Sequence, residues 1–133
     1  MDQGPVIVVD DDDAVRRSLK FALELEGLSV RLYGGGGQLL AEIDLPARGC
    51  LVIDYYMPGI DGVELVARLR RRHVVLPAIL ITGRASADLR RRAALAGFQR
   101  VLEKPLEDSA LIDSIRHALA AMPGCAGDLR NIP

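Results

Sequence analysis

The sequence predicts an α/β fold, in which a five-stranded parallel sheet is covered by helices on both faces. Short apolar runs rich in Val and Ile alternate five times with longer segments whose apolar residues recur at helical spacing. The short runs carry almost no charge, which is expected of strands buried on both faces of a parallel sheet. Such an alternation requires right-handed crossover connections, and these place helices on both sides of the sheet.

Each element has its own signal in the sequence. The expected strands are residues 6–9, 28–32, 50–53, 78–81 and 99–102. The expected helices are residues 14–26, 38–43, 62–72, 86–95 and 108–121. Gly27 and Gly97 supply the stops of the first and fourth helices. The first, third and fifth helices each carry an apolar stripe; its members are Val15, Leu19, Ala22 and Leu23, then Val63, Val66 and Ala67, then Leu111, Ile112, Ile115 and Leu119.

The second helix is the weakest of the five. It follows four consecutive glycines, residues 34–37, and ordering glycine is entropically unfavourable. We therefore expect a mobile loop at residues 34–37 and a shortened second helix. A phosphate-binding role for the glycines is disfavoured, because the run lacks the Lys–Ser/Thr ending that such a loop requires.

The composition of the 133-residue chain indicates one globular domain, residues 1–121, followed by a tail or linker stub, residues 122–133. The net charge of −1 argues against a general nucleic-acid binder. No apolar run reaches transmembrane length, and the N-terminus lacks the basic segment of a signal peptide. Cys50 and Cys125 form no metal spacing and no disulfide framework, and Cys50 is expected in the core. We expect a reduced, cytoplasmic protein without membrane association.

Four of the expected strands end in a chemically reactive residue. Asp10 and Asp11 follow the first strand, Asp54 follows the third, Thr82 the fourth, and Lys104 comes two residues after the fifth. Ligands of open parallel sheets bind at the carboxyl ends of the strands. The sequence therefore predicts that three carboxylates, a hydroxyl and an ammonium group meet in one small site.

Three carboxylates in one site repel one another, so either one of them is protonated or a cation lies among them, and the cation is the simpler solution. A hard divalent ion with oxygen ligands fits, and Mg²⁺ suits a partly hydrated site with two or so carboxylates. The run of aspartates also begins the first helix, where acids cap free N–H groups, and we assign that role to Asp12 and Asp13. Helix capping does not explain Asp54, which stands alone at the end of its strand.

Thr82 and Lys104 complete an anion site beside the expected cation. Taken alone, Thr82 is a strand-end hydroxyl that satisfies local backbone, and Lys104 an exposed turn lysine. Together with the acids they indicate phosphate chemistry, in which the cation attracts a phosphate while Lys104 and Thr82 orient its other oxygens. Pro105 follows the lysine directly, and a cis bond there would suit a tight turn.

These motifs resemble the receiver domain of two-component response regulators across residues 5–121, and the likeness is to FixJ-type receivers. The matching motifs, in order and spacing, are VVDDD, DYYMPGIDG, ITG and EKP. The resemblance implies a (βα)₅ flavodoxin-like receiver fold with strand order 2-1-3-4-5. It implies that Asp54 accepts a phosphoryl group from a histidine kinase, and that Mg²⁺ is held by Asp10, Asp11, Asp54 and the backbone carbonyl of Tyr56. Thr82 would be the switch hydroxyl and Lys104 the partner of a phosphoryl oxygen.

The chain departs from the receiver pattern on the expected fifth strand. Receivers usually carry an aromatic residue three positions before the lysine, whose rotamer follows the switch hydroxyl. That position is Val101, which is short and stiff at χ1, so the usual aromatic coupling is in doubt. The resemblance further implies that phosphorylation of Asp54 draws Thr82 inward, shifts residues 83–86 and changes the surface formed by the fourth helix, fifth strand and fifth helix.

The same surface would carry signal output or a homodimer contact. Arginine runs lie at the end of the third helix (Arg68 and residues 70–72) and in the fourth (residues 90–92). These arginines are expected to lie on solvent-exposed helix faces, where they complement the helix dipole, and the alternative is that they recognise a partner. The output would be transcriptional control through a missing or separate effector, and we expect no direct nucleic-acid binding by this chain.

Three other functions fit parts of the sequence. A phosphorylation-independent interaction module is favoured by Val101 but opposed by the intact set of acids, threonine and lysine. An aspartate-nucleophile phosphatase, a true enzyme, would need a second acid at the position of Tyr56. A flavodoxin-like cofactor binder would need a Ser/Thr-rich phosphate loop after the first strand, where four aspartates would repel the phosphate. We therefore expect a signalling protein and not a conventional enzyme.

Overall fold

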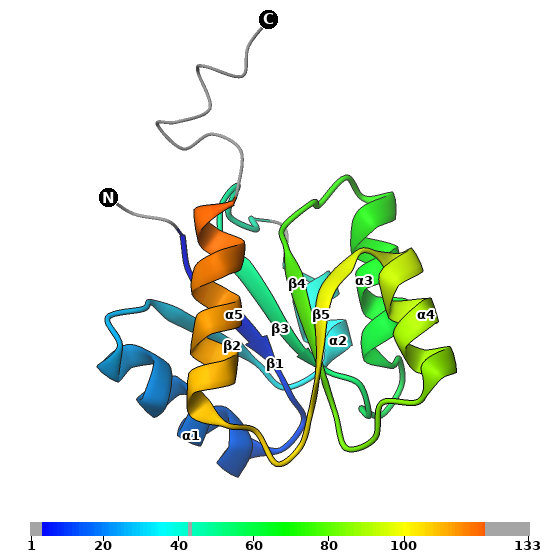
Figure 1. Cartoon of the computed structure of the whole chain (residues 1–133). Helices are drawn as coiled ribbons and strands as arrows, with labels where there is room; N and C mark the ends of the chain where they lie inside the picture. The colour runs from blue at the N-terminus through cyan, green and yellow to red at the C-terminus, as the bar shows by residue number, and fades with distance from the viewer. Residues whose placement is uncertain (1–3, 43, 122–133) are drawn as a thin grey trace, which may run out of the picture.

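The computed structural model describes residues 4–42 and 44–121, and these form one parallel sheet flanked by helices (Figure 1). The strands are β1 (Val6–Val9), β2 (Val30–Tyr33), β3 (Cys50–Asp54), β4 (Ala78–Thr82) and β5 (Phe98–Glu103). Their order is β2-β1-β3-β4-β5, and every neighbouring pair is parallel. The predicted α/β class and the strand order 2-1-3-4-5 are confirmed. The expected tail, residues 122–133, lies outside the described residues.

Helices cover both faces of this sheet, as the sequence predicts. They are α1 (Asp13–Leu25), α2 (Gly36–Leu40), α3 (Gly62–Arg71), α4 (Ala87–Ala96) and α5 (Asp108–Ala120). α1 and α5 lie on one face of the sheet, and α2, α3 and α4 on the other (Figure 1). Within the described part of the chain, no helix has both the length and the apolar character needed to cross a bilayer.

The central strands are buried along their whole length because helices pack on both of their faces. All residues of β1, β3 and β4 are buried. Cys50 is fully buried in β3, as predicted, and burial raises the pKa of its thiol to about 12. Each fully buried Ile or Leu of this core contributes about 1.5–3 kcal/mol relative to the exposed side chain. A rigid layer of strands thereby fixes the positions of the residues that follow each strand end.

Side-chain caps begin the helices next to the strand ends. The Asp12 carboxylate accepts hydrogen bonds from the backbone N–H groups of Ala14 and Val15, which confirms its expected capping role. Asp61 accepts from Glu64 N–H at 2.8 Å, and Ser86 accepts from Leu89 N–H at 3.1 Å. Such caps each contribute about 1 kcal/mol to stability, because they satisfy N–H groups that have no partner within the helix.

α2 is short, as expected, but its position differs from the prediction. The helix begins at Gly36, so two of the four glycines assigned to a loop are helical and the predicted start at Gln38 is wrong. A Cβ atom at Gly36 would lie 3.0 Å from Ile60 Cγ1, and this close approach explains why glycine stands there. Gln38 stabilises the turn before the helix, since its Oε1 accepts from Gly34 N–H at 2.8 Å.

Candidate functional site

The predicted site residues meet at the carboxyl end of the sheet. Asp10 follows β1 directly, Asp54 and Thr82 are the last residues of β3 and β4, and Lys104 follows β5. Asp10, Asp54 and Thr82 are buried, with at most 6% of each residue exposed. Lys104 reaches over them, and its Nζ lies 3.4 Å from Asp54 Oδ1.

The three acids form a compact set of oxygen donors. One carboxylate oxygen from each of Asp10, Asp11 and Asp54 lies within 4.8 Å of the others. Asp11 is exposed, whereas the other two are buried, so the set opens to solvent on one side. Three hard oxygen donors at this spacing fit a divalent cation that keeps part of its water shell.

The electrostatics of the site show that its negative charge is under-compensated. Burial and the nearby Asp10 carboxylate together raise the pKa of Asp54 to about 6, although the Lys104 ammonium opposes them. Burial also raises the pKa of Asp10, although the backbone N–H of Asp12 donates to its Oδ1 at 2.8 Å. A cation bound among these oxygens would relieve the repulsion, which supports the fit of a metal ion to this set.

Arg16 of α1 holds the main chain of the site, a contact that the sequence analysis missed. Its Nη1 donates to the carbonyl oxygen of Asp10 at 2.6 Å, and its Nη2 pairs with Asp13 at 3.1 Å. The Asp13–Arg16 spacing of three residues on a helix predicts their ion pair. The bond to Asp10 depends on how α1 packs beside β1, so periodicity alone does not reveal it.

Thr82 is engaged with the loop that follows β4. Its hydroxyl donates to the carbonyl oxygen of Arg84 at 3.1 Å and accepts from Arg84 N–H at 3.3 Å. Beside it, the backbone N–H of Ala85 donates to Glu103 Oε2 at 2.8 Å. Thr82 thus satisfies local backbone groups in this conformation, as a hydroxyl at the end of a strand is expected to do. The role of Glu103 was missed, because nothing in the EKP motif indicates where the glutamate points.

The two tyrosines after Asp54 differ in their surroundings. Tyr56 is 68% exposed, and its ring meets that of Tyr55 edge to face, with centroids 4.8 Å apart. The Tyr55 hydroxyl accepts from Arg92 Nη1 of α4 at 3.3 Å, a second contact that the sequence does not reveal. Val101 is partly buried and pairs with Leu80, as a residue of the fifth strand should.

Glycine is required where α3 begins beside the site. A Cβ atom at Gly62 would lie 2.7 Å from the carbonyl oxygen of Asp54 and 2.9 Å from Leu80 Cδ1. The backbone N–H of Gly62 also donates to the carbonyl oxygen of Tyr55 at 3.0 Å. The helix start therefore rests directly on the main chain that carries Asp54.

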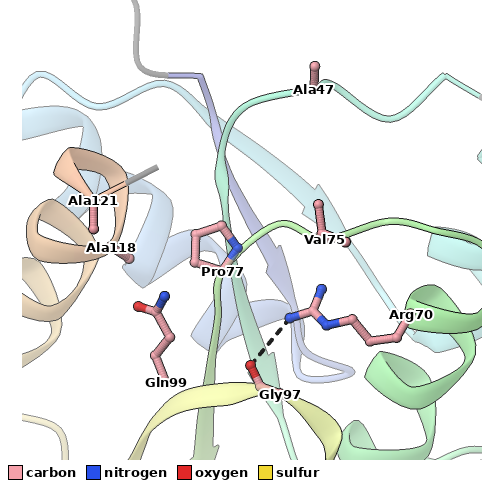
Figure 2. Close-up of a pocket in the computed structure, with 8 residues that line it drawn as sticks. All are labelled: Ala47, Arg70, Val75, Pro77, Gly97, Gln99, Ala118 and Ala121. Carbon is pink, nitrogen blue, oxygen red and sulfur yellow. Dashed lines mark hydrogen bonds between the residues drawn. The ribbon is translucent and has the colours of Figure 1, made fainter. Parts of the chain in front are cut away.

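A cavity of about 390 Å³ lies at the opposite end of the sheet, away from these groups (Figure 2). Pro77 and Gly97, which precede β4 and β5, line it together with Val75 and Arg70. Arg70 donates to the carbonyl oxygens of Val74 and Gly97, at 2.9 Å and 3.3 Å. None of the predicted site residues lines this cavity, so its size does not make it the functional site.

Comparison with known proteins shows which family has this fold. The response regulator receiver domain family matches residues 6–116. The transcriptional regulatory protein FixJ of Azorhizobium caulinodans is 43% identical over 116 residues, which are 86% of this chain and 54% of that protein. The C4-dicarboxylate transport transcriptional regulatory protein DctD of Pseudomonas aeruginosa is 40% identical over 117 residues, 88% of this chain and 25% of that protein.

A solved structure agrees with the sequence relatives. The crystal structure of FixJ-N matches with a TM-score of 0.84 at 35% identity, and the match covers 92% of this chain and 98% of that one. This chain spans about half, or less, of the length of the FixJ and DctD relatives. The fold, the site at its carboxyl edge and these matches lead to one conclusion: the chain belongs to the response regulator receiver domain family, the signalling modules of two-component systems.

Proposed function

We propose that this receiver accepts a phosphoryl group on Asp54 from the phosphohistidine of a sensor histidine kinase. The single observation that carries the proposal is the pairing of Lys104 Nζ with Asp54 Oδ1 at 3.4 Å inside a set of three converging carboxylates. Nucleophile, anion partner and cation ligands thus occupy one edge of the sheet. That combination suits phosphoryl transfer, in which catalysis is mostly positioning and charge neutralisation.

The transfer forms one bond and breaks another. An Asp54 carboxylate oxygen attacks the phosphorus, the P–N bond of the donor breaks, and its electron pair returns to the imidazole. The product is an aspartyl phosphate, a mixed anhydride that water later hydrolyses to restore the carboxylate. Because burial raises the pKa of Asp54 only to about 6, the carboxylate is ionised and nucleophilic at neutral pH.

Mg²⁺ is the cofactor that receiver domains generally use, and the acids of this site fit it. Asp10, Asp11, Asp54 and the backbone carbonyl of Tyr56 would hold the ion, which neutralises phosphoryl oxygens when bound. Lys104 would pair with a further oxygen of the phosphoryl group. Thr82 would donate its hydroxyl proton to the phosphoryl group once that proton leaves the carbonyl oxygen of Arg84.

The partners and the output belong to the same proposal. The cognate partner is a sensor histidine kinase, and α4, β5 and α5 would form the output or homodimer surface. Both FixJ and DctD are transcriptional regulatory proteins longer than this chain, so transcriptional control through a further effector is the proposed output. The receiver itself would not bind nucleic acid, and it would work in the cytoplasm.

The alternative is a receiver that works as a protein-interaction module without phosphorylation. Val101 favours it, because a valine cannot swing between solvent and pocket as the usual aromatic does. The closeness of Lys104 to Asp54 opposes it, since an interaction module has no need of a buried nucleophile beside an ammonium group.

Incubation with acetyl phosphate and Mg²⁺, followed by intact mass measurement, decides between these two. The parent chain should gain the mass of one phosphoryl group, and Asp54→Asn should gain none. Asp113→Asn is the matched control, because Asp113 is an exposed acid of α5 that stands outside the three-acid set. Equal gains in the parent and Asp54→Asn, or no gain in either, would contradict the proposal.

A further inference from the structure

The loop between β4 and α4, residues 83–86, is held from two sides. On the β4 side, the Thr82 hydroxyl exchanges hydrogen bonds with the backbone of Arg84, at 3.1 Å and 3.3 Å. On the β5 side, Glu103 Oε2 accepts from Ala85 N–H at 2.8 Å. Ser86 then caps α4 by accepting from Leu89 N–H at 3.1 Å. Hydrogen bonds at successive residues of this loop therefore link the Thr82 hydroxyl to the start of α4.

Glu103 occupies a special place on β5. It pairs with Thr82 across the two strands and stands directly before Lys104. It lies two residues beyond Val101, so both side chains project from the same face of the strand. Where Val101 is too short and stiff to follow the hydroxyl, the longer carboxylate two positions later already contacts the loop.

We propose that Glu103 is a positioning residue that holds residues 83–86 in the resting arrangement, and that its bond to Ala85 breaks when the receiver is phosphorylated. The inference rests on the proposed phosphorylation of Asp54. The Thr82 hydroxyl has one proton, which now goes to the Arg84 carbonyl oxygen and cannot also go to a phosphoryl oxygen. When the Thr82 hydroxyl turns to the phosphoryl group, it no longer donates to the carbonyl oxygen of Arg84. The bond between Glu103 and Ala85 then opposes the movement of the loop until that bond breaks as well.

Glu103 would thus couple the state of the Thr82 hydroxyl to the loop 83–86 through a polar contact, where other receivers use an aromatic side chain. The resting state has the Glu103–Ala85 bond, and the phosphorylated state lacks it, so the bond biases the equilibrium toward rest. Removal of the Glu103 carboxylate should then shift the equilibrium toward the active arrangement, and ligands that prefer that arrangement should bind more tightly. By linkage, a phosphoryl analogue on Asp54 should in turn weaken the protection of the Ala85 amide.

The experiment compares Glu103→Ala and Glu103→Gln with Asp113→Ala, which removes an exposed carboxylate from α5. Two quantities are measured: hydrogen exchange of the Ala85 amide in the resting protein, and half-saturation by beryllofluoride in the presence of Mg²⁺. Glu103→Ala should speed exchange at Ala85 and lower the half-saturating beryllofluoride concentration about fivefold, as expected for loss of one hydrogen bond from the resting state only. Glu103→Gln keeps an acceptor oxygen and should stay within about twofold of the parent.

A purely structural role for Glu103 gives a different result. In that case Glu103→Ala would speed exchange at Ala85 but leave beryllofluoride binding unchanged or weaker, and the inference would be overturned. Exchange at Ala85 identical to that of Asp113→Ala would overturn it as well. A parent chain that gains no phosphoryl mass would instead refute the proposed function, whereas a phosphorylated parent with Glu103→Ala equal to Asp113→Ala would refute the role of Glu103 alone.

Discussion

At the scale of single residues, Asp54 combines burial with a charge that the site only partly compensates. The residue is 6% exposed, and the pKa of its carboxyl group is raised to about 6 by burial and by Asp10, in spite of Lys104. Between its ordinary pKa of 3.8 and the raised value of about 6, the carboxyl group keeps a proton in the folded state that the unfolded chain has already released. The residue that the proposed chemistry needs as an anion is thus one that opposes folding at neutral pH.

Replacement of this acid should therefore stabilise the protein when no metal is bound. The ordinary pKa of the group is 3.8, so its contribution is intact below pH 4 and is lost as the pH rises through about 6. In EDTA at pH 7 we expect Asp54→Asn to increase the free energy of unfolding by about 2 kcal/mol. Thermal or urea unfolding at pH 7 and pH 4.5 measures the effect, and the gain should shrink at the lower pH.

The matched control for this prediction is Asp113→Asn on α5, whose side chain is exposed. Removal of an exposed charge should change the free energy of unfolding by less than about 0.5 kcal/mol. If Asp54→Asn proves less stable than the parent in EDTA at pH 7, then the attraction of Lys104 outweighs burial, and the pKa of Asp54 is lowered and not raised.

At the scale of elements, the glycines of α2 differ from one another although they are neighbours. Gly36 is buried against Ile60, whereas a Cβ atom at Gly37 would meet nothing within 4 Å. The four-glycine run predicts a short helix correctly, because glycine disfavours helix formation. It does not reveal that the helix starts within the run, nor that Gly36 packs against Ile60, because Ile60 lies in a loop distant in the sequence.

Alanine substitutions should separate these two glycines. Gly37→Ala should stabilise the protein by about 0.5–1 kcal/mol, since it adds helix propensity in open space. Gly36→Ala adds the same propensity but brings its Cβ atom to 3.0 Å from Ile60 Cγ1, so its net effect should be at least about 1 kcal/mol less favourable than that of Gly37→Ala. Urea denaturation of the two variants measures the difference, and equal stability would mean that Ile60 yields freely.

At the scale of the whole molecule, the order of the strands along the chain explains where the site residues lie. It does not explain the side-chain hydrogen bonds that surround the site. Residues at the ends of parallel strands share one edge, so Asp10, Asp54, Thr82 and Lys104 meet where the sequence predicts. Three hydrogen bonds around the site do not follow from chain order, because each joins a long side chain to a partner that packing brings near. They are the bonds from Arg16 to Asp10, from Ala85 to Glu103 and from Arg92 to Tyr55. Such reach depends on rotamers and helix placement, which hydrophobic periodicity does not specify.

Mg²⁺ should stabilise the whole domain through its acidic set. Binding to the folded state alone raises the free energy of unfolding by about 1.4 kcal/mol for each tenfold rise in Mg²⁺ above the dissociation constant. We expect the unfolding temperature of the parent to rise with Mg²⁺, and that of Asp10→Asn/Asp11→Asn to stay constant. Asp113→Asn, which removes an exposed acid of α5, should respond like the parent, and an equal response of the double variant would locate the ion elsewhere.

The contact between Gly62 and the main chain of Asp54 limits how this receiver can change over generations. The nearest neighbour of the missing side chain is a carbonyl oxygen 2.7 Å away, which cannot rotate aside as a side chain would. A larger residue at position 62 would therefore displace the end of β3 that carries Asp54, whereas substitutions on the outer surface of α3 would leave it in place. Lineages that acquire new signalling partners are expected to vary the exposed arginines of that helix and to keep this one position without a side chain.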